Sequence, residues 1–77
     1  MINCKVVSRE SSDHFEALKA VTLPTLSGKV QVLSGHPEYF SLLKKGDLIL
    51  EREGAKEKLS IENGVCYFIK NEMTIII

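Results

Sequence analysis

The sequence predicts an all-β fold of the kind found in sandwiches and barrels. Short apolar runs recur along the chain, and a turn signal follows each run. Apolar and polar residues alternate in several of these runs, for example at positions 29–32, which places the apolar side chains on one face of a strand. A length of 77 residues predicts a single domain, residues 1–77, and the chain contains no linker or repeat.

The first half of the chain contains three candidate strands. Residues 2–7 are rich in β-branched residues and form the first. Residues 20–23 form the second, which Pro24 and the Ser27-Gly28 turn are expected to close. Residues 29–32 form the third, and the sequence Ser34-Gly35-His36-Pro37 then breaks the alternating pattern.

The second half begins with a predicted hairpin. Leu48 and Leu50 should face one way and their neighbours the other, as in a strand with one buried face. Residues 53–56 contain a glycine and form a plausible hairpin turn. Leu59 and Ile61 alternate with polar residues in the strand that follows.

Two further strands are predicted at the end of the chain. Asn63-Gly64 is a strong signal for a short turn, because both residues tolerate positive φ. Residues 65–69 and 73–77 are predicted to pair around a turn at residues 70–72. Their near-continuous hydrophobicity predicts that both faces of these strands are covered.

Two segments have patterns that fit helix as well as strand. Asp13 and Glu16 have the spacing of a capping box at the start of a short helix. Within residues 38–45, Tyr39 and Leu42 or Leu43 have helical spacing. Local pattern alone leaves helix and strand open for both segments.

The composition excludes several classes of protein. Ten basic and ten acidic residues cancel, which argues against non-specific binding to nucleic acid. Cys4 and Cys66 are too few for a disulfide scaffold and lie in apolar runs, so we expect them to be reduced and buried. The sequence shows no signal peptide and no run of roughly 18 apolar residues, which predicts a soluble, cytoplasmic protein.

No catalytic, cofactor-binding or metal-binding constellation is predicted. His14 and His36 lack partners at metal-ligand spacing, apart from the adjacent Asp13. Ser34 lies beside His36 but outside the Gly-x-Ser-x-Gly context that exposes a nucleophile. The glycines form no phosphate-binding loop. A small hydrolase built on Ser34, His36 and an acid is therefore the weakest of the alternatives.

One ordered set of residues resembles a known family. Val21-Thr22-Leu23-Pro24 is followed by Gly28, Val32-Leu33, Gly35-His36 and Gly46. This order and spacing resembles the N-terminal β-sandwich domain of the epsilon subunit of F-type ATP synthases, over essentially the whole chain. The resemblance implies two antiparallel sheets with about ten short strands, and it favours strands in both ambiguous segments. Family members usually continue into two C-terminal helices, which nothing in this sequence matches, so a short form without the helical hairpin is expected.

The resemblance also implies a function in the rotor of the synthase. It implies a non-catalytic central-stalk subunit, without a cofactor, that couples ion-driven rotation of the c-ring to ATP synthesis. The implied partners are the gamma subunit, the c-ring and the catalytic head, with a peripheral location on the cytoplasmic side of the membrane and no nucleic acid. The residues that match the ring-facing end of the family are Lys29, Gln31, Ser34, Gly35, His36 and Pro37.

The sequence departs from the family pattern at some of these ring-facing positions. Ser34 stands where the family usually has a proline, and Lys29 stands where it often has an acidic residue. His36 is expected to donate a hydrogen bond across the contact, so that His36→Ala weakens assembly and leaves thermal unfolding nearly unchanged. The main alternative function is a free-standing β-sandwich adaptor that binds another protein or a small ligand.

Overall fold

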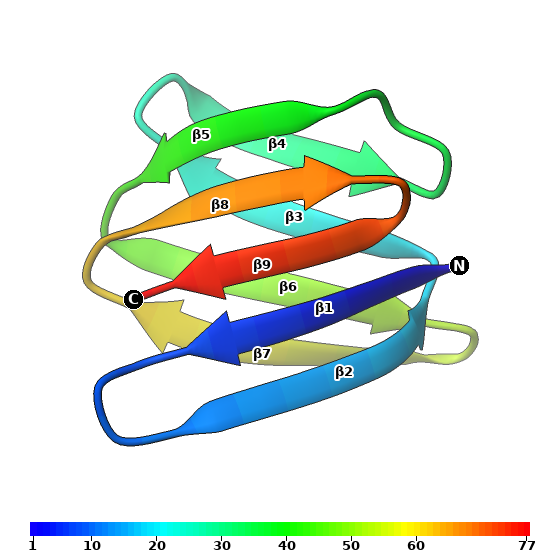
Figure 1. The fold of residues 1–77 in the computed structure, drawn as a ribbon, viewed down its shortest axis with the longest axis horizontal. Coiled ribbons are helices and arrows are strands. Elements are labelled where there is room, and N and C mark those ends of the chain that lie inside the picture. Colours follow the sequence, from blue (N-terminus) through cyan, green and yellow to red (C-terminus); the bar gives the residue numbers. More distant parts are fainter.

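The computed structural model describes residues 1–77 and consists of strands joined by short turns (Figure 1), which confirms the predicted all-β class. The strands are β1 (Ile2–Val7), β2 (Ser12–Leu18), β3 (Ala20–Thr25), β4 (Gly28–Leu33), β5 (Tyr39–Leu43), β6 (Gly46–Arg52), β7 (Ala55–Ile61), β8 (Gly64–Ile69) and β9 (Glu72–Ile76). No helix long and apolar enough to cross a membrane occurs in the structure.

The strands form two facing layers that belong to one hydrogen-bonded path. Figure 1 shows β2, β1, β9, β8 and β5 in the front layer, with β7, β6, β3 and β4 behind them. A single backbone pair, Thr25 with Leu43, connects β3 to β5 and so joins the layers. The backbone N–H of Lys44 donates to the Pro24 carbonyl at 2.8 Å where the chain changes layer. The expected sandwich is therefore a curled nine-stranded sheet, close to the ten strands expected.

The first and last strands of the chain lie side by side and run in parallel. Asn3 of β1 pairs with Glu72 of β9, and the register continues to Val7 and Ile76. The expectation of a wholly antiparallel fold is wrong at this pair. A short hairpin forces an antiparallel pair, whereas strands separated by the whole chain are free to pair in either direction.

Both ambiguous segments are strands, as the resemblance implied. The residues of the apparent capping box lie in β2, where Asp13 pairs with Val6 of β1. A bulge follows, because Phe15 pairs with Cys4 while Leu18 pairs with Ile2. Ala17 adopts a φ of 59° within this bulge. The bulge redirects the end of β2 so that the Leu18 side chain is fully buried.

The β8–β9 turn has positive φ at Lys70 and Asn71, whereas the β7–β8 turn at Asn63-Gly64 does not. Lys70 and Asn71 have φ of 50° and 61°, the geometry of a two-residue hairpin turn, and they connect β8 to β9. The predicted turn is present, since it connects β7 to β8, but neither Asn63 nor Gly64 has positive φ. Gly64 is needed for space, because a Cβ there would lie 2.6 Å from the carbonyl oxygen of Ile76.

The core lies between the two layers and is apolar, with Thr25 the one polar side chain that is fully buried. It consists of Ile2, Cys4, Val6, Leu18, Val21, Leu23, Val32, Leu43, Leu48, Leu50, Ile61, Cys66, Phe68, Met73 and Ile75. Cys4 and Cys66 are free thiols inside this core, as predicted. The prediction that β8 and β9 are covered on both faces is wrong, because Tyr67 and Ile76 are 42% and 52% exposed.

Candidate partner-binding surface

The predicted ring-facing residues follow β4 and the loop after it. Lys29 and Gln31 are exposed near the start and middle of β4, which pairs only with β3 and leaves its other edge free. The Ser34–Pro37 loop leaves the opposite end of this six-residue strand. The structure thus brings the four loop residues together and separates Lys29 from them by the length of β4.

The β4–β5 loop is fixed to a turn that is distant in sequence. The Gly35 backbone N–H donates to the Asn71 side-chain oxygen Oδ1 at 2.7 Å. Gly35 has a φ of 86°, which a residue with a Cβ adopts at a cost. The His36 N–H donates to the Leu33 carbonyl at 3.0 Å. The loop is therefore held in one shape before any partner arrives.

His36 packs against the aromatic side chains beneath the loop. Its ring lies edge-on to Tyr39, with centroids 5.5 Å apart, and edge-on to the buried Phe68 at 6.0 Å. Its Nδ1 lies 2.8 Å from the Pro37 carbonyl, which only accepts, so Nδ1 is the donor in this bond. The side chain is half-buried, and Nε2 is the ring nitrogen left for a partner.

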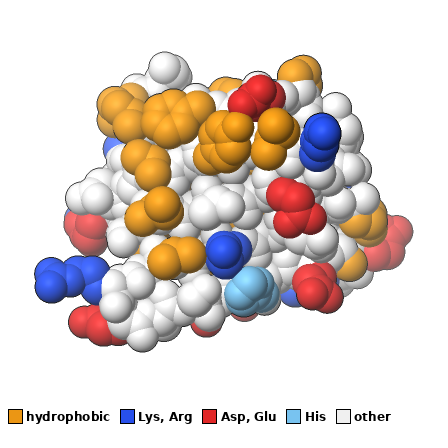
Figure 2. All heavy atoms as spheres, viewed as in Figure 1, with side chains coloured by type: hydrophobic (Ala, Val, Ile, Leu, Met, Phe, Trp, Pro, Cys, Tyr) orange, Lys and Arg blue, Asp and Glu red, His pale blue; other side chains and the backbone are white.

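An apolar surface that the sequence analysis missed lies on the outer side of the front layer. We call it the apolar face and define it as Phe40, Leu42, Val65, Tyr67 and Ile76. Figure 2 shows hydrophobic side chains gathered over β5, β8 and β9 on this side of the molecule. The register explains the grouping, since Phe40 pairs with Tyr67, and Val65 pairs with both Leu42 and Ile76.

The signal for this face was present in the sequence. The continuous hydrophobicity of residues 65–69 and 73–77 does mean that both faces of the strands are apolar. One of those faces is the core, and the other is open to solvent in this chain. The continuous apolar run thus gives an exposed apolar face rather than a second buried layer.

A hydrogen bond fixes one aromatic side chain of the apolar face. The Tyr67 hydroxyl donates to Oε2 of Glu38 at 2.5 Å. This bond raises the pKa of Tyr67 above its ordinary value, with smaller contributions from desolvation and from the Glu38 charge. The phenol is therefore kept in its neutral form at the rim of the face.

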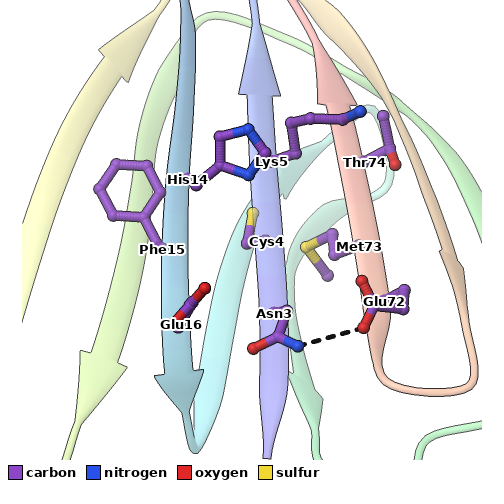
Figure 3. A pocket seen from close by; sticks show the side chains of 9 residues that line it. All are labelled: Asn3, Cys4, Lys5, His14, Phe15, Glu16, Glu72, Met73 and Thr74. Carbon is purple, nitrogen blue, oxygen red and sulfur yellow. Dashed lines mark hydrogen bonds between the residues drawn. The ribbon is translucent and has the colours of Figure 1, made fainter.

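A separate hollow of about 270 Å³ lies over β2, β1 and β9 (Figure 3). Asn3 Nδ2 donates to Glu72 Oε2 at 3.1 Å on one side, and Figure 3 shows His14 beside Lys5 on the other. Cys4 also lines the hollow, but burial, with a smaller contribution from Cys66, raises the pKa of its thiol to about 12. A nucleophilic cysteine needs a lowered pKa, so this thiol is suited to packing and not to attack.

The charged groups do not converge into a metal site. No three His, Cys, Asp or Glu side chains gather as possible ligands. Ser34 and His36 are two positions apart in the loop, and the His36 Nδ1 is bonded to the Pro37 carbonyl rather than to the serine hydroxyl. What the surface does offer is an apolar face, a fixed loop and a free strand edge, which are features of a binding protein.

Comparison with known sequences identifies relatives along the whole chain. The family described as ATP synthase, Delta/Epsilon chain, beta-sandwich domain matches residues 1–77. The ATP synthase epsilon chain of Helicobacter pylori strain Shi470 is 30% identical over 76 residues, and that of Endomicrobium trichonymphae is 26% identical over 72 residues. These matches cover 99% and 94% of this chain but 62% and 52% of the relatives, so the chain spans less than two thirds of their length.

Solved structures share the fold at lower identity. A chain of the Euglena gracilis mitochondrial ATP synthase gives a TM-score of 0.86 at 23% identity, over 97% of this chain and 49% of that one. A chain in the central stalk and c-ring structure of the Tetrahymena thermophila enzyme gives 0.81 at 12% identity, over 97% and 61%. With its fold and its full-length family match in agreement, this chain belongs to the ATP synthase delta/epsilon chain β-sandwich domain family.

Proposed function

We propose that this chain is a non-catalytic rotor subunit of an F-type ATP synthase, which binds the gamma subunit and the c-ring. In this role it couples ion-driven rotation of the ring to ATP synthesis in the catalytic head, on the cytoplasmic side of the membrane. Family membership over residues 1–77 and relatives named epsilon chain support the proposal. The single observation that carries it in the structure is the unpartnered apolar face.

The apolar face is the proposed contact with gamma. Phe40 is 61% exposed although it lies on a regular strand, and the aromatic Tyr67 lies directly opposite it on β8. Exposed apolar patches rimmed by polar groups mark protein contacts, and aromatic side chains often dominate their binding energy. Glu38 provides a polar group at the rim of this face through its bond to Tyr67, and Lys5 lies on the neighbouring part of the layer, opposite Thr74 of β9.

The ring-facing contact is proposed along the free edge of β4 and the loop after it. The residues are those that the sequence predicted, namely Lys29, Gln31, Ser34, Gly35, His36 and Pro37. The bond between Gly35 and Asn71 supports this proposal, because a loop that is already ordered loses less entropy on binding. In this proposal Lys29 and Gln31 extend the contact along the strand, and Nε2 of His36 is the nitrogen available to the ring.

A rotor subunit must transmit force without shearing, and the fold suits that requirement. The parallel pair of β1 and β9 connects the two ends of the chain within one sheet. The core side chains between the layers are close to fully buried, and close-packed interiors have low compressibility. A push on one layer is therefore expected to move the whole molecule.

Co-purification tests the proposed function. The wild-type chain should elute with gamma and ring subunits from solubilised membranes, and Phe40→Glu should abolish its binding to gamma. Lys56→Gln, a surface change on β7 in the back layer, is the matched control and should bind normally. A wild-type chain that remains a monomer, or that elutes with an unrelated protein, would favour the free-standing adaptor instead.

A further inference from the structure

The outer surface of the back layer contains a hollow surrounded by lysines. It has a volume of about 410 Å³ and lies over β4, β3, β6 and β7 beside the β5–β6 turn. Four of the residues that line it are lysines, and we call this site the lysine hollow: Lys29, Lys44, Lys45 and Lys58. All four are exposed.

Strand register brings these lysines together from three parts of the chain. Lys29 on β4 pairs with Pro24 of β3. The N–H of Lys44 donates to the carbonyl of the same proline, which sets the β5–β6 turn against β3. Lys58 on β7 pairs with Ile49, whose side chain also lines the hollow. The grouping is thus a consequence of the fold and is not visible in the sequence.

The charges of the lysine hollow are not neutralised within the molecule. The one ion pair in the structure joins Arg52 to Glu57 at 3.5 Å, so no carboxylate lies within 4.0 Å of the four ammonium groups. Asp47 is the only acidic residue that lines the hollow, and its Oδ1 accepts a hydrogen bond from Ser60 at 2.8 Å. The chain is neutral overall, yet positive charge is concentrated here. Such a site attracts anions.

We propose that the lysine hollow binds a carboxylate-bearing loop of the ring-side partner. This inference rests on the proposed function, because Lys29 belongs both to the hollow and to the proposed ring-facing residues. The ammonium groups complement carboxylates, and a concave site accepts a protruding polypeptide loop. A flat bilayer surface, in contrast, meets projecting lysines better than lysines set around a hollow. Electrostatic attraction of this kind speeds docking and selects the partner.

The first test compares two fourfold variants with the same change in charge. One carries Gln at Lys29, Lys44, Lys45 and Lys58, and the control carries Gln at Arg9, Lys19, Lys56 and Lys70. The full chain is titrated against a subcomplex of gamma and c-ring from the same organism. The hollow variant should raise Kd about 30-fold at low salt and the control about 3-fold or less, given the strength of exposed ion pairs. At about 1 M salt the difference should nearly vanish.

The outcome separates this inference from the proposed function. If the wild-type chain does not bind the subcomplex, the proposed function fails. If the wild-type chain binds and both variants bind equally well, the lysine hollow proposal is overturned and the proposed function stands. Circular dichroism of both variants confirms that the sheet is intact before titration.

The second test uses a synthetic peptide with the sequence of the polar loop of that ring. The peptide should bind the wild-type chain and lose binding when its Asp and Glu residues are replaced by Asn and Gln. Equal binding of both peptides, or a ring loop that lacks carboxylates, would overturn the proposal. Vesicles of phosphatidylglycerol or of phosphatidylcholine are the third probe. Binding to the anionic vesicles that depends on the four lysines, without binding to the peptide, would assign the hollow to the membrane.

Discussion

The amide of Gly35 and the side-chain oxygen of Asn71 are hydrogen-bonded at 2.7 Å although 36 residues separate them in sequence. The Asn71 carbonyl also accepts a hydrogen bond, at 2.9 Å, from the amide of Asn3. One residue in the β8–β9 turn therefore fixes the start of β1 and the β4–β5 loop. Its φ of 61° suits asparagine, which tolerates this region better than most residues with a Cβ.

Removing the Asn71 side chain should release the loop. Asn71→Gly keeps the positive φ and deletes the acceptor, so we expect a loss of about 0.5–1.5 kcal/mol in the free energy of unfolding. Amide hydrogen exchange at Gly35 should become faster, whereas Asn71→Asp, which retains an acceptor, should preserve protection. An unchanged exchange rate at Gly35 in Asn71→Gly would show that the bond does not hold the loop.

Gly64 should disfavour a larger residue because of the space around it, whereas Gly54 is constrained by its backbone conformation. A Cβ at Gly64 would lie 2.6 Å from the carbonyl oxygen of Ile76, so Gly64→Ala should cost about 1–3 kcal/mol in urea unfolding. Gly54 has a φ of 74° and open space around it, so Gly54→Asn should cost much less. Equal costs at the two sites would contradict the close approach of β8 and β9.

His36→Ala should lower stability as well as any binding. The ring packs edge-on against Tyr39 and Phe68, and aromatic contacts contribute about 0.5–1.5 kcal/mol each beyond area burial. The midpoint of thermal unfolding should therefore fall. This differs from the expectation from sequence, which left unfolding nearly unchanged. Lys29→Gln and Gln31→Ala are better probes of the interface, because both side chains are exposed. An unchanged midpoint of thermal unfolding in His36→Ala would show that these aromatic contacts do not stabilise the fold.

Local patterns predicted most strands and turns because their causes are local. Residues 2–7 correspond to β1 without a change of bounds, and the alternation at Leu48 and Leu50 placed both side chains in the core. The resemblance resolved residues 12–18 and 39–43 correctly where periodicity could not. Helical spacing in such short segments is overridden when a strand already offers an unpaired edge.

Features that depend on long-range pairing were not predictable in the same way. The parallel register of Asn3 with Glu72 and the lysine hollow both arise from strands that are far apart in sequence. Asn63-Gly64 tolerates positive φ but turns without it, whereas Lys70 and Asn71, which lack a glycine, do adopt it. The sequence analysis placed six ring-facing residues in one group. The fold distributes them along β4 and the loop that follows it.

The ionisation of Tyr67 should reveal its bond to Glu38. The bond raises the pKa of Tyr67 above 10.0, so the folded state favours the protonated phenol. Any stability from this bond is present below pH 10 and is lost as pH rises through the folded pKa. In a Tyr39→Phe background, which leaves one tyrosine, the phenolate absorbance should titrate with a midpoint above the pKa of tyrosine in the unfolded chain. Glu38→Gln should lower this midpoint toward the unfolded pKa, and an unchanged midpoint would contradict the assignment.

The two buried thiols should make stability fall in alkaline solution. Burial raises the pKa of Cys4 and of Cys66 from 9.0 to about 12, so each thiol stays protonated in the folded chain at a pH where the unfolded chain has ionised. Their contribution is complete below pH 9 and declines as pH rises toward 12, because the folded state binds more protons in that window. Urea unfolding on either side of pH 9 should show the decline.

Replacing both cysteines by alanine provides the control for this pH dependence. The double variant should be less stable at neutral pH, because each substitution leaves a space in the core. Its stability should fall less steeply above pH 9 than that of the wild type, since only the remaining groups titrate. Thiol reagents should label the wild type at the rate of unfolding, because Cys4 and Cys66 are 3% and 0% exposed. Fast labelling of the folded chain, or parallel pH profiles of the two proteins, would mean that these thiols are in contact with solvent and that the layers open at β1 and β8.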